Sequence, residues 1–173
     1  PPPSSPSSPS HLTAPRSGAP EHLSAAFRRQ AAQITALCSA LHTFRCWMES
    51  FSMATSEAIP ILCCGDFNAT PDSPTYAAMA QGSCGLELRS AFAMANGKEP
   101  TYTNVTEQYQ GCLDYIWLES RGDDPLLSVV EAPSAVHEDV TLLSEDVALP
   151  SRRFPSDHLP LTCLLALRSS RQR

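Results

Sequence analysis

A long helical pattern followed by a short apolar run constrains the fold of this chain more than any other feature. Between residues 21 and about 48, apolar side chains recur at steps of three and four residues, which predicts an amphipathic helix. The recurring positions are Leu23, Phe27, Ile34, Leu37, Leu41, Phe44 and Met48. Residues 59–64 are continuously apolar, which is typical of a strand that is buried on both faces. The order of these two elements predicts an α/β fold in which the helix packs on a sheet.

Shorter segments extend this α/β pattern. Strands are predicted at 101–104, 112–118, 126–131 and 159–167, because each is β-branched, aromatic or aliphatic. Residues 74–80 are expected to form a short helix with Pro74 in its first turn. Residues 88–95 are expected to add one or two helical turns that end at Asn96-Gly97. Residues 132–155 are expected to be a loop.

The first 20 residues differ in composition from the rest. They contain seven prolines and six serines and cannot bury a core, so a disordered segment is predicted at 1–20. The 173 residues suit one domain or part of a larger one, and 42% of them are hydrophobic, which is enough for a core. No apolar run approaches the length of a membrane span, so no membrane contact is expected.

Charge and cysteine content argue against two kinds of site. The net charge is −6 and Lys98 is the single lysine, which disfavours binding of nucleic acid through a broad basic surface. The same charge is compatible with a nuclease whose metal ions face the phosphates. None of the seven cysteines forms a C-x-x-C pair, so a zinc site is not expected. Those in apolar, strand-like segments are predicted to be reduced core residues of a cytosolic or nuclear protein; they are Cys63, Cys64, Cys112 and Cys163.

Asp66 and Asn68 are the first candidates for a functional site. They follow the strand predicted at 59–64, where α/β sheets commonly form a binding crevice. In an extended segment their side chains point the same way. A carboxylate can activate water or bind a hard cation, and an amide can donate to a phosphate oxygen. The alternative is a structural Asx-turn that closes the loop before Pro71.

Asp157, His158 and Asp114 form a second group of candidates. The first two open the last predicted strand; a histidine can contact a phosphate and transfer a proton, and an aspartate can ligate Mg²⁺. Asp114 lies in an otherwise apolar strand, where a carboxylate is costly unless it is paired. We expect it to pair with His158 and to fix the imidazole tautomer. The alternatives are a surface turn at Asp157 and His158, and an exposed edge position for Asp114.

Arg152, Arg153 and Tyr109 carry weaker signals. The two arginines precede Asp157 and can steer a phosphate, although solvated surface positions are favoured for both. Tyr109 lies five residues before Asp114 and can stack on a base, although simple packing is favoured for an isolated tyrosine near a turn.

Together these residues resemble the endonuclease/exonuclease/phosphatase family. The matching strings, in the family's order and spacing, are Ile61-Leu62-Cys63-Cys64-Gly65-Asp66-Phe67-Asn68-Ala69-Thr70-Pro71-Asp72-Ser73, Tyr102-Thr103-Asn104, Gly111-Cys112-Leu113-Asp114-Tyr115-Ile116 and Pro155-Ser156-Asp157-His158-Leu159-Pro160-Leu161. The Pro-Asp-Ser and Tyr-Thr-Asn segments look most like the deadenylase-like branch, which holds carbon catabolite repressor type deadenylases, nocturnin, Angel proteins and 2′-phosphodiesterase. The resemblance covers residues 21–168, which look like the C-terminal half of the family's domain, before a polar tail at 169–173.

The resemblance implies a four-layer α/β sandwich with two central mixed β-sheets. It also implies phosphodiester hydrolysis that depends on Mg²⁺, with Mn²⁺ as an alternative. By that resemblance, Asp66 activates or positions the attacking water near the metal, and Asn68 holds the scissile phosphate. His158 contacts the same phosphate and is oriented by Asp114, while Asp157 belongs to the metal shell.

Two substrate-binding residues are also implied by the resemblance. Tyr109 takes the position where deadenylases place an aromatic ring on the substrate base. Ser10-His11-Leu12 corresponds to a family strand end, which makes His11 a candidate. The family's N-terminal half, with an asparagine and the main metal-binding glutamate, has no counterpart in these residues.

The function expected from these residues is that of a deadenylase-like 3′–5′ exoribonuclease acting on RNA, either poly(A) or oligoadenylate. The expected compartment is the cytoplasm or nucleus, with mitochondria as an alternative. Alternatives of the same class are a 2′,5′-oligoadenylate phosphodiesterase and a phosphatase that acts on a dinucleotide. A non-catalytic relative that binds RNA or a protein partner is a different class. The intact set of candidate side chains argues against that last alternative.

Overall fold

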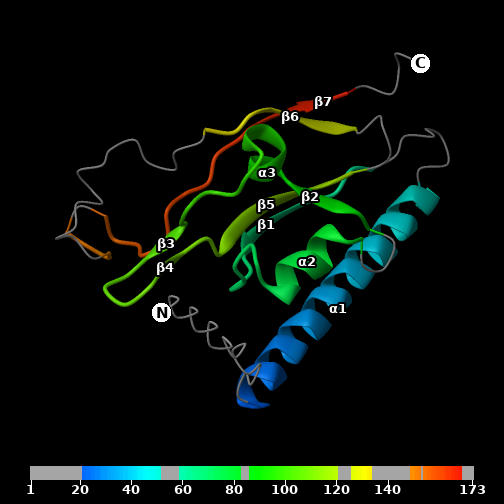
Figure 1. Ribbon diagram of the computed structural model, residues 1–173. Coiled ribbons are helices and arrows are strands. Elements are labelled where there is room, and N and C mark those ends of the chain that lie inside the picture. The colour runs from blue at the N-terminus through cyan, green and yellow to red at the C-terminus, as the bar shows by residue number, and fades with distance from the viewer. Residues whose placement is uncertain are drawn as a thin grey trace, which may run out of the picture.

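The computed structural model describes residues 21–51, 59–82, 86–120, 126–133, 149–152 and 154–168 (Figure 1). The elements in these residues are α1 (Glu21–Phe51), β1 (Leu62–Asp66), α2 (Pro74–Ala80), β2 (Leu88–Ser90), α3 (Ala91–Asn96), β3 (Asn104–Val105), β4 (Gln110–Gly111), β5 (Asp114–Glu119), β6 (Leu127–Glu131) and β7 (Leu164–Leu167). The segments predicted to be disordered at 1–20 and polar at 169–173 lie outside the described residues, as does most of the loop predicted at 132–155.

The strand β5 is the centre of the fold. It lies between β1 and β2 in a three-stranded sheet and is antiparallel to both. Its side chains alternate between the two faces of the sheet, as the two-residue period of a strand requires. Tyr115 and Trp117 face one core, and Ile116 and Leu118 face another; all four are at most 9% exposed.

Helices α1 and α2 cover one face of this sheet. Cys38 of α1 and Met79 of α2 are buried against Tyr115 and Trp117, whose ring centroids lie 5.5 Å apart. The helix predicted at 74–80 is confirmed as α2, which begins at Pro74 after the hydroxyl of Ser73 caps its first turn. In Figure 1 the two helices lie below the sheet.

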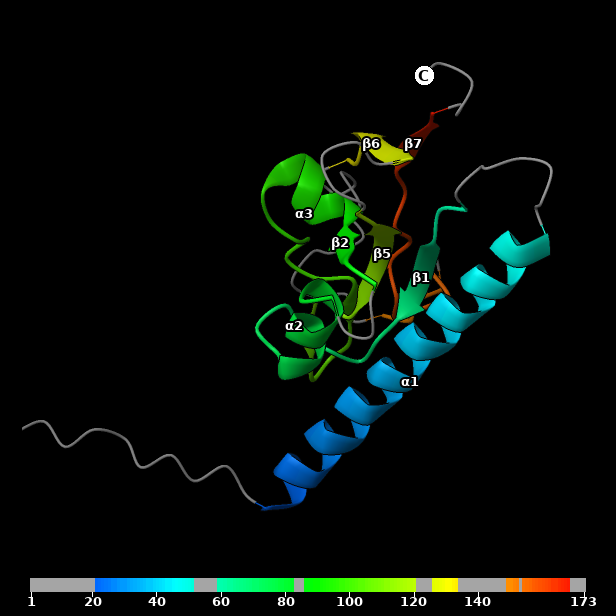
Figure 2. The ribbon, with the colours of Figure 1, turned by 90° about the vertical axis from the view of Figure 1, so that its right-hand side faces the viewer.

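The opposite face is covered by α3 and by a separate antiparallel pair, β6 and β7. Leu127, Val129 and Leu165 pack on the side of β5 that carries Ile116 and Leu118. Figure 2 shows the helix α1 on one side of β1, β5 and β2, with β6 and β7 at a distance from it. The order of helix layer, central sheet and second sheet confirms the predicted α/β class, and each described strand pairing is antiparallel.

The buried face of α1 agrees with the predicted one in part: Ile34 is 7% exposed and Leu41 packs against the core. Cys38 and Arg45 are at most 9% exposed, whereas Phe44 and Met48 are 59% and 37% exposed. The side of the helix that faces the sheet carries Ile34, Cys38 and Arg45, and the guanidinium of Arg45 forms a buried ion pair with Glu119 at the end of β5. A charge is rarely buried unless it is paired, so this contact helps to hold this side of the helix against the sheet. Among the described residues, no helix is long and apolar enough to cross a membrane.

The strand β1 is not buried on both faces, contrary to the prediction for residues 59–64. Leu62 is 47% exposed, and Cys64 is exposed rather than part of the core. Among the described strands, β1 pairs only with β5, and Cys63 packs against the core that α1 and α2 cover. Leu62 and Cys64 point to the opposite face, because side chains alternate along a strand, and that face stays exposed. Cys112 is 2% exposed and free, as predicted, while Cys63 and Cys163 are free and half-buried.

Three strand or helix boundaries also differ from prediction. Residues 88–95 divide into β2 and α3, because pairing with β5 overrides local helix propensity. The strand predicted at 101–104 is displaced to β3, which pairs with the unpredicted β4. Of the strand predicted at 159–167, only β7 is regular. The strands predicted at 112–118 and 126–131 are confirmed as β5 and β6.

Candidate functional site

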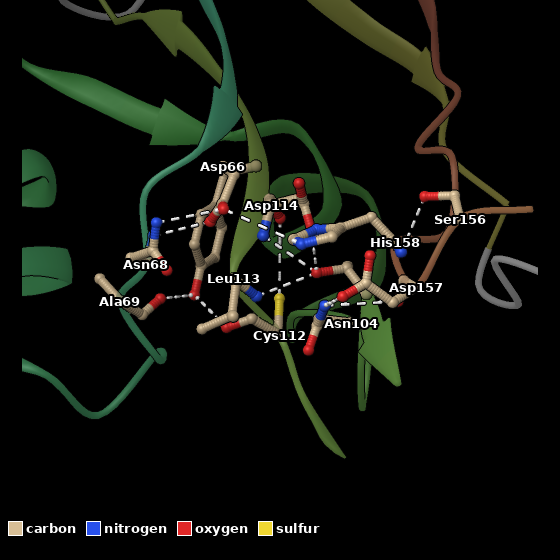
Figure 3. Close-up of polar contacts among 12 residues, drawn as sticks. Asp66, Asn68, Ala69, Asn104, Cys112, Leu113, Asp114, Ser156, Asp157 and His158 are labelled. Carbon is tan, nitrogen blue, oxygen red and sulfur yellow. Dashed lines mark hydrogen bonds and ion pairs between the residues drawn. The ribbon is translucent and has the colours of Figure 1, made fainter. Parts of the chain in front are cut away.

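Three segments of the chain meet at one end of the central sheet. Asp66 at the end of β1 is the register partner of Asp114 at the start of β5. The short strand β3 reaches the last segment, because Asn104 forms an antiparallel bridge with His158. Figure 3 shows the side chains of Asp66, Asp114 and His158 gathered between these segments. The fold therefore brings together residues that are far apart in the sequence.

His158 stands between two carboxylates. Its Nδ1 lies 2.8 Å from Oδ2 of Asp114, and its Nε2 lies 4.0 Å from Oδ2 of Asp66. The contact predicted between Asp114 and His158 is thus present. Since Asp114 accepts the Nδ1–H, the Nε2 atom is left facing Asp66, on the accessible side of a ring that is 32% exposed.

The surroundings of His158 raise the pKa of its imidazole above the ordinary value. The hydrogen bond to Asp114 is the main cause; burial opposes it, and the charges of Asp114, Asp66 and Asp157 add to it. Each of these carboxylates stabilises the protonated ring. The surroundings therefore favour the protonated imidazole more than water does, and this form can donate a proton or a hydrogen bond from Nε2.

Asp66 and Asn68 form a tight turn with each other. The backbone N–H of Asn68 donates to Oδ1 of Asp66 at 2.8 Å, and the Asn68 amide donates to Oδ2 at 3.1 Å. Asn68 has a φ of 48°, in the left-handed region that asparagine tolerates better than most residues. The Asx-turn considered from the sequence is present, and it points both side chains toward the same accessible region.

Asp157 is held by Asn104. The Asn104 amide lies 3.3 Å from the carbonyl oxygen and 3.4 Å from Oδ2 of Asp157. No group of three or more His, Cys, Asp or Glu side chains among the described residues could hold a metal ion. Because Mg²⁺ often uses only one or two protein carboxylates, with water and phosphate completing its shell, Asp66 and Asp157 fit part of such a shell.

Thr103 and Asn104 are site residues to which the sequence interpretation gave no role. The hydroxyl of Thr103 donates to Oδ2 of Asp114 at 2.7 Å, so it contacts the same oxygen as His158. Asn104 holds Asp157, as described above. Their string was part of the family resemblance, and that was the only signal in the sequence that could have found them.

The remaining sequence candidates lie around this centre or outside the described residues. Tyr109 is 41% exposed and lies in the turn between β3 and β4, with its ring over Gly111. Arg152 is exposed, and Arg153 lies outside the described residues, as does His11. The structure therefore places Tyr109 on the same hairpin as Asn104 and leaves His11 a prediction.

A cavity of about 780 Å³ opens beside Asp66 and Asn68. It is lined by α1 on one side, with Gln30 and Gln33, and by residues 63–68 on the other. The amide of Gln30 donates to the carbonyl oxygen of Asn68 at 3.0 Å and so links the helix to the turn. The volume of this cavity lies in the range typical of ligand sites, but His158 does not line it.

The thiol of Cys112, two residues before Asp114, is not suited to nucleophilic catalysis. Burial raises the pKa of Cys112 to about 12, so this side chain stays protonated at neutral pH. A thiolate mechanism is therefore disfavoured at Cys112.

Fold and site together define the class of protein. A sequence profile of the endonuclease/exonuclease/phosphatase family matches residues 23–158, and the chain belongs to this family. The human nocturnin catalytic domain, solved with a bound sulfate anion, superposes on 82% of this chain and 42% of that structure. The TM-score is 0.52 and the sequence identity is 29%. The likeness confirms that the chain has part of this α/β fold.

Individual relatives are similar over a shorter stretch. The 2′,5′-phosphodiesterase 12 of Rattus norvegicus is 36% identical over 122 residues, which are 61% of this chain and 19% of that protein. Nocturnin of Homo sapiens is 38% identical over 116 residues, 61% of this chain and 24% of the relative. The CCR4-Not complex 3′-5′-exoribonuclease subunit Ccr4 of Yarrowia lipolytica is 30% identical over 128 residues, 62% of this chain and 17% of the relative. The chain thus spans about a fifth of the length of these relatives.

Proposed function

We propose that this chain belongs to a Mg²⁺-dependent phosphodiester hydrolase, a deadenylase-like 3′–5′ exoribonuclease. The observation that carries the proposal is the placement of His158 between Asp114 and Asp66, with Nδ1 held at 2.8 Å and Nε2 facing the accessible side. A positioned imidazole of this kind can donate a hydrogen bond or a proton to a phosphate during hydrolysis. The similarity to three hydrolytic relatives supports the same class of reaction.

In this proposal each side chain has a separate role, which its geometry supports. His158 binds the scissile phosphate through Nε2, and Asp114 keeps the ring oriented and stabilises its protonated form. Asp66 positions the attacking water, because its side chain is 34% exposed and lies opposite Nε2. Asn68 uses one amide hydrogen on Asp66 and keeps the other for a phosphate oxygen.

Asp66 and Asp157 would hold the metal. Family members of this kind depend on divalent metals; Mg²⁺ is proposed here, with Mn²⁺ as the alternative. When bound, the cation would neutralise charge that develops on the phosphate. Asn104 keeps the carboxylate of Asp157 in place for that role.

We propose an RNA substrate that ends in poly(A) or oligoadenylate. Tyr109 is 41% exposed, and its ring packs against Gly111 of the β3–β4 hairpin. An exposed ring that is held in this way is suited to stacking on a base. His11 stays a substrate-binding candidate from the resemblance alone. A 2′,5′-linked oligoadenylate is the second candidate, because one relative with 36% identity is named a 2′,5′-phosphodiesterase. Cytoplasm or nucleus is the expected compartment, with mitochondria as the alternative.

The test is a hydrolysis assay of the natural protein that contains these residues. Oligo(A), 2′,5′-linked oligoadenylate and a dinucleotide are compared with Mg²⁺, Mn²⁺ and a chelator. Metal-dependent shortening of oligo(A) from the 3′ end supports the proposal, and its loss in His158→Ala connects the activity to this site. Phe44→Ala, on the exposed face of α1, is the matched control and should keep full activity. Hydrolysis that is unchanged in His158→Ala, or that proceeds with the chelator present, would contradict the proposal.

A further inference from the structure

Thr103 is buried at the point where the three site segments meet. It is 0% exposed, and it immediately precedes β3. Its backbone N–H donates to Gly111 at 2.9 Å, and its carbonyl oxygen accepts the N–H of Leu159 at 2.7 Å. The residue is therefore fixed by both the β4 strand and the segment that carries His158.

The hydroxyl of Thr103 has its hydrogen-bonding capacity filled. Its oxygen accepts the backbone N–H groups of Leu113 and Asp114, each at 2.9 Å. A hydroxyl has two lone pairs and one proton. With both lone pairs occupied, the proton has one direction left, toward Oδ2 of Asp114 at 2.7 Å.

The same oxygen of Asp114 accepts the Nδ1–H of His158 at 2.8 Å. We propose that Thr103 is a positioning residue for catalysis, whose hydroxyl fixes Oδ2 of Asp114 so that this carboxylate holds His158 with Nε2 facing Asp66. Two donors that converge on one oxygen hold the carboxylate in a single orientation. The expected effect of Thr103 on catalysis rests on the proposed function, whereas the hydrogen bonds of Thr103 do not depend on it.

A structural role for Thr103 predicts a different result. The hydroxyl also satisfies two backbone N–H groups at the start of β5, and losing it lowers stability whatever the site does. A stability measurement alone does not distinguish the roles. Turnover and the state of the His158 ring distinguish the two roles. A purely structural contact changes neither of these two properties once the protein is folded.

The variants are Thr103→Val, Thr103→Ser and the control Thr75→Val, each in the natural protein that contains these residues. Thr75 is 1% exposed, and its hydroxyl has no partner among the described residues, so the control removes a buried hydroxyl without a hydrogen bond. We expect Thr103→Val to lower kcat for oligo(A) about 10- to 100-fold with little change in KM, as losses of orienting partners do. Thr103→Ser should restore most of the turnover, and Thr75→Val should keep it.

Proton NMR of the His158 ring gives a readout that does not need activity. The downfield signal of the Nδ1 proton should be weakened or lost in Thr103→Val and kept in Thr103→Ser and Thr75→Val. If Thr103→Val does not fold, Thr103→Cys, with its weak thiol donor, replaces it and should show an intermediate loss.

The outcomes separate the two proposals. A folded Thr103→Val protein with wild-type kcat, or with an unchanged Nδ1 signal, overturns the positioning role. The same results for Thr103→Cys overturn it if Thr103→Val is unfolded. A wild-type protein that hydrolyses no substrate overturns the proposed function instead, and the NMR signal then decides the role of Thr103 by itself.

Discussion

The strands β5 and β1 are neighbours in one sheet, yet they lie in different environments. Leu118 of β5 is 1% exposed, while its register partner Leu62 of β1 is 47% exposed. Both strands are rich in apolar residues, so their composition does not explain the difference. β5 has a strand on each side and a core on each face, whereas β1 pairs only with β5 among the described strands. The burial of a strand thus follows from its neighbours more than from its own hydrophobicity.

The same asymmetry continues into the site. Asp114 of β5 is 19% exposed and is held by Thr103 and His158, which we call the fixed side. Asp66 of β1 is 34% exposed, and its hydrogen bonds among the described residues come from Asn68 in its own turn; we call this the open side. A carboxylate on the fixed side is suited to orienting a neighbour, and one on the open side is suited to meeting a ligand.

The largest expected effect lies on the fixed side. Asp114→Asn should lower turnover by about 10²–10⁴, because the amide neither stabilises the protonated imidazole nor fixes its tautomer. His158→Ala and Asp66→Ala should each lower it by at least ~10². Asp72→Asn, an exposed acid in the loop after Asn68, is the control and should keep its activity. Full turnover in Asp114→Asn would contradict the orienting role that we assign to the carboxylate on the fixed side.

The pH dependence of stability should change in the same variant. The carboxylate of Asp114 raises the pKa of folded His158 above its ordinary value of 6.5. The pair therefore stabilises the folded protein fully below the unfolded pKa and loses this contribution as pH rises through the folded pKa. Asp114→Asn should lower the pKa of His158, measured by NMR titration, and should flatten this pH dependence in urea unfolding. An unchanged pKa would contradict the assigned pairing.

The next largest effect compares the two strands directly. Trp117→Ala in β5 should lower the free energy of unfolding by about 3–5 kcal/mol, because it leaves a cavity in the core. Leu62→Ala in β1 should cost less than about 1 kcal/mol, because the side chain is already half exposed. Urea unfolding of the two variants measures both. A cost of Leu62→Ala as large as that of Trp117→Ala would contradict the difference between the strands.

A smaller effect is expected at the base-stacking position. A methyl group at Gly111 would lie 2.7 Å from Cζ of Tyr109, so Gly111→Ala should push the ring away from its present place. We expect KM for oligo(A) to rise about tenfold, in line with the free energy of stacking a base on an aromatic ring. Gln110→Ala, at the exposed neighbour on β4, is the control and should leave KM unchanged. An unchanged KM in Gly111→Ala would remove Tyr109 from the substrate site.

The smallest effect concerns the thiols. Cys64 of β1 is exposed and should react with a thiol reagent in the folded protein, although burial raises its pKa moderately. Cys112, next to β5, is 2% exposed with a pKa of about 12 and should react only after unfolding. Cys64→Ser should change stability by less than about 0.5 kcal/mol, as surface substitutions usually do. Rapid labelling of Cys112 in the native protein would contradict the difference between the strands.

Much of the site was predictable because its chemistry is visible in single residues. A carboxylate in an apolar strand calls for a partner, and His158 supplies it at 2.8 Å from Asp114. The role of Thr103 was not predictable in this way, because a buried threonine is ordinary in any core. Only the contact with Oδ2 of Asp114 distinguishes it.

The sequence by itself determined the α/β class, most of the elements and the residue types of the site, because periodicity and local chemistry act over a few neighbouring residues. Tertiary structure decided which of the apolar side chains of α1 are buried and which strand is central. Both depend on partners distant in the sequence, such as Glu119 for Arg45 and the two strands that flank β5. The convergence on Oδ2 of Asp114 was decided in the same way, because it requires β3, β5 and the His158 segment to meet in space.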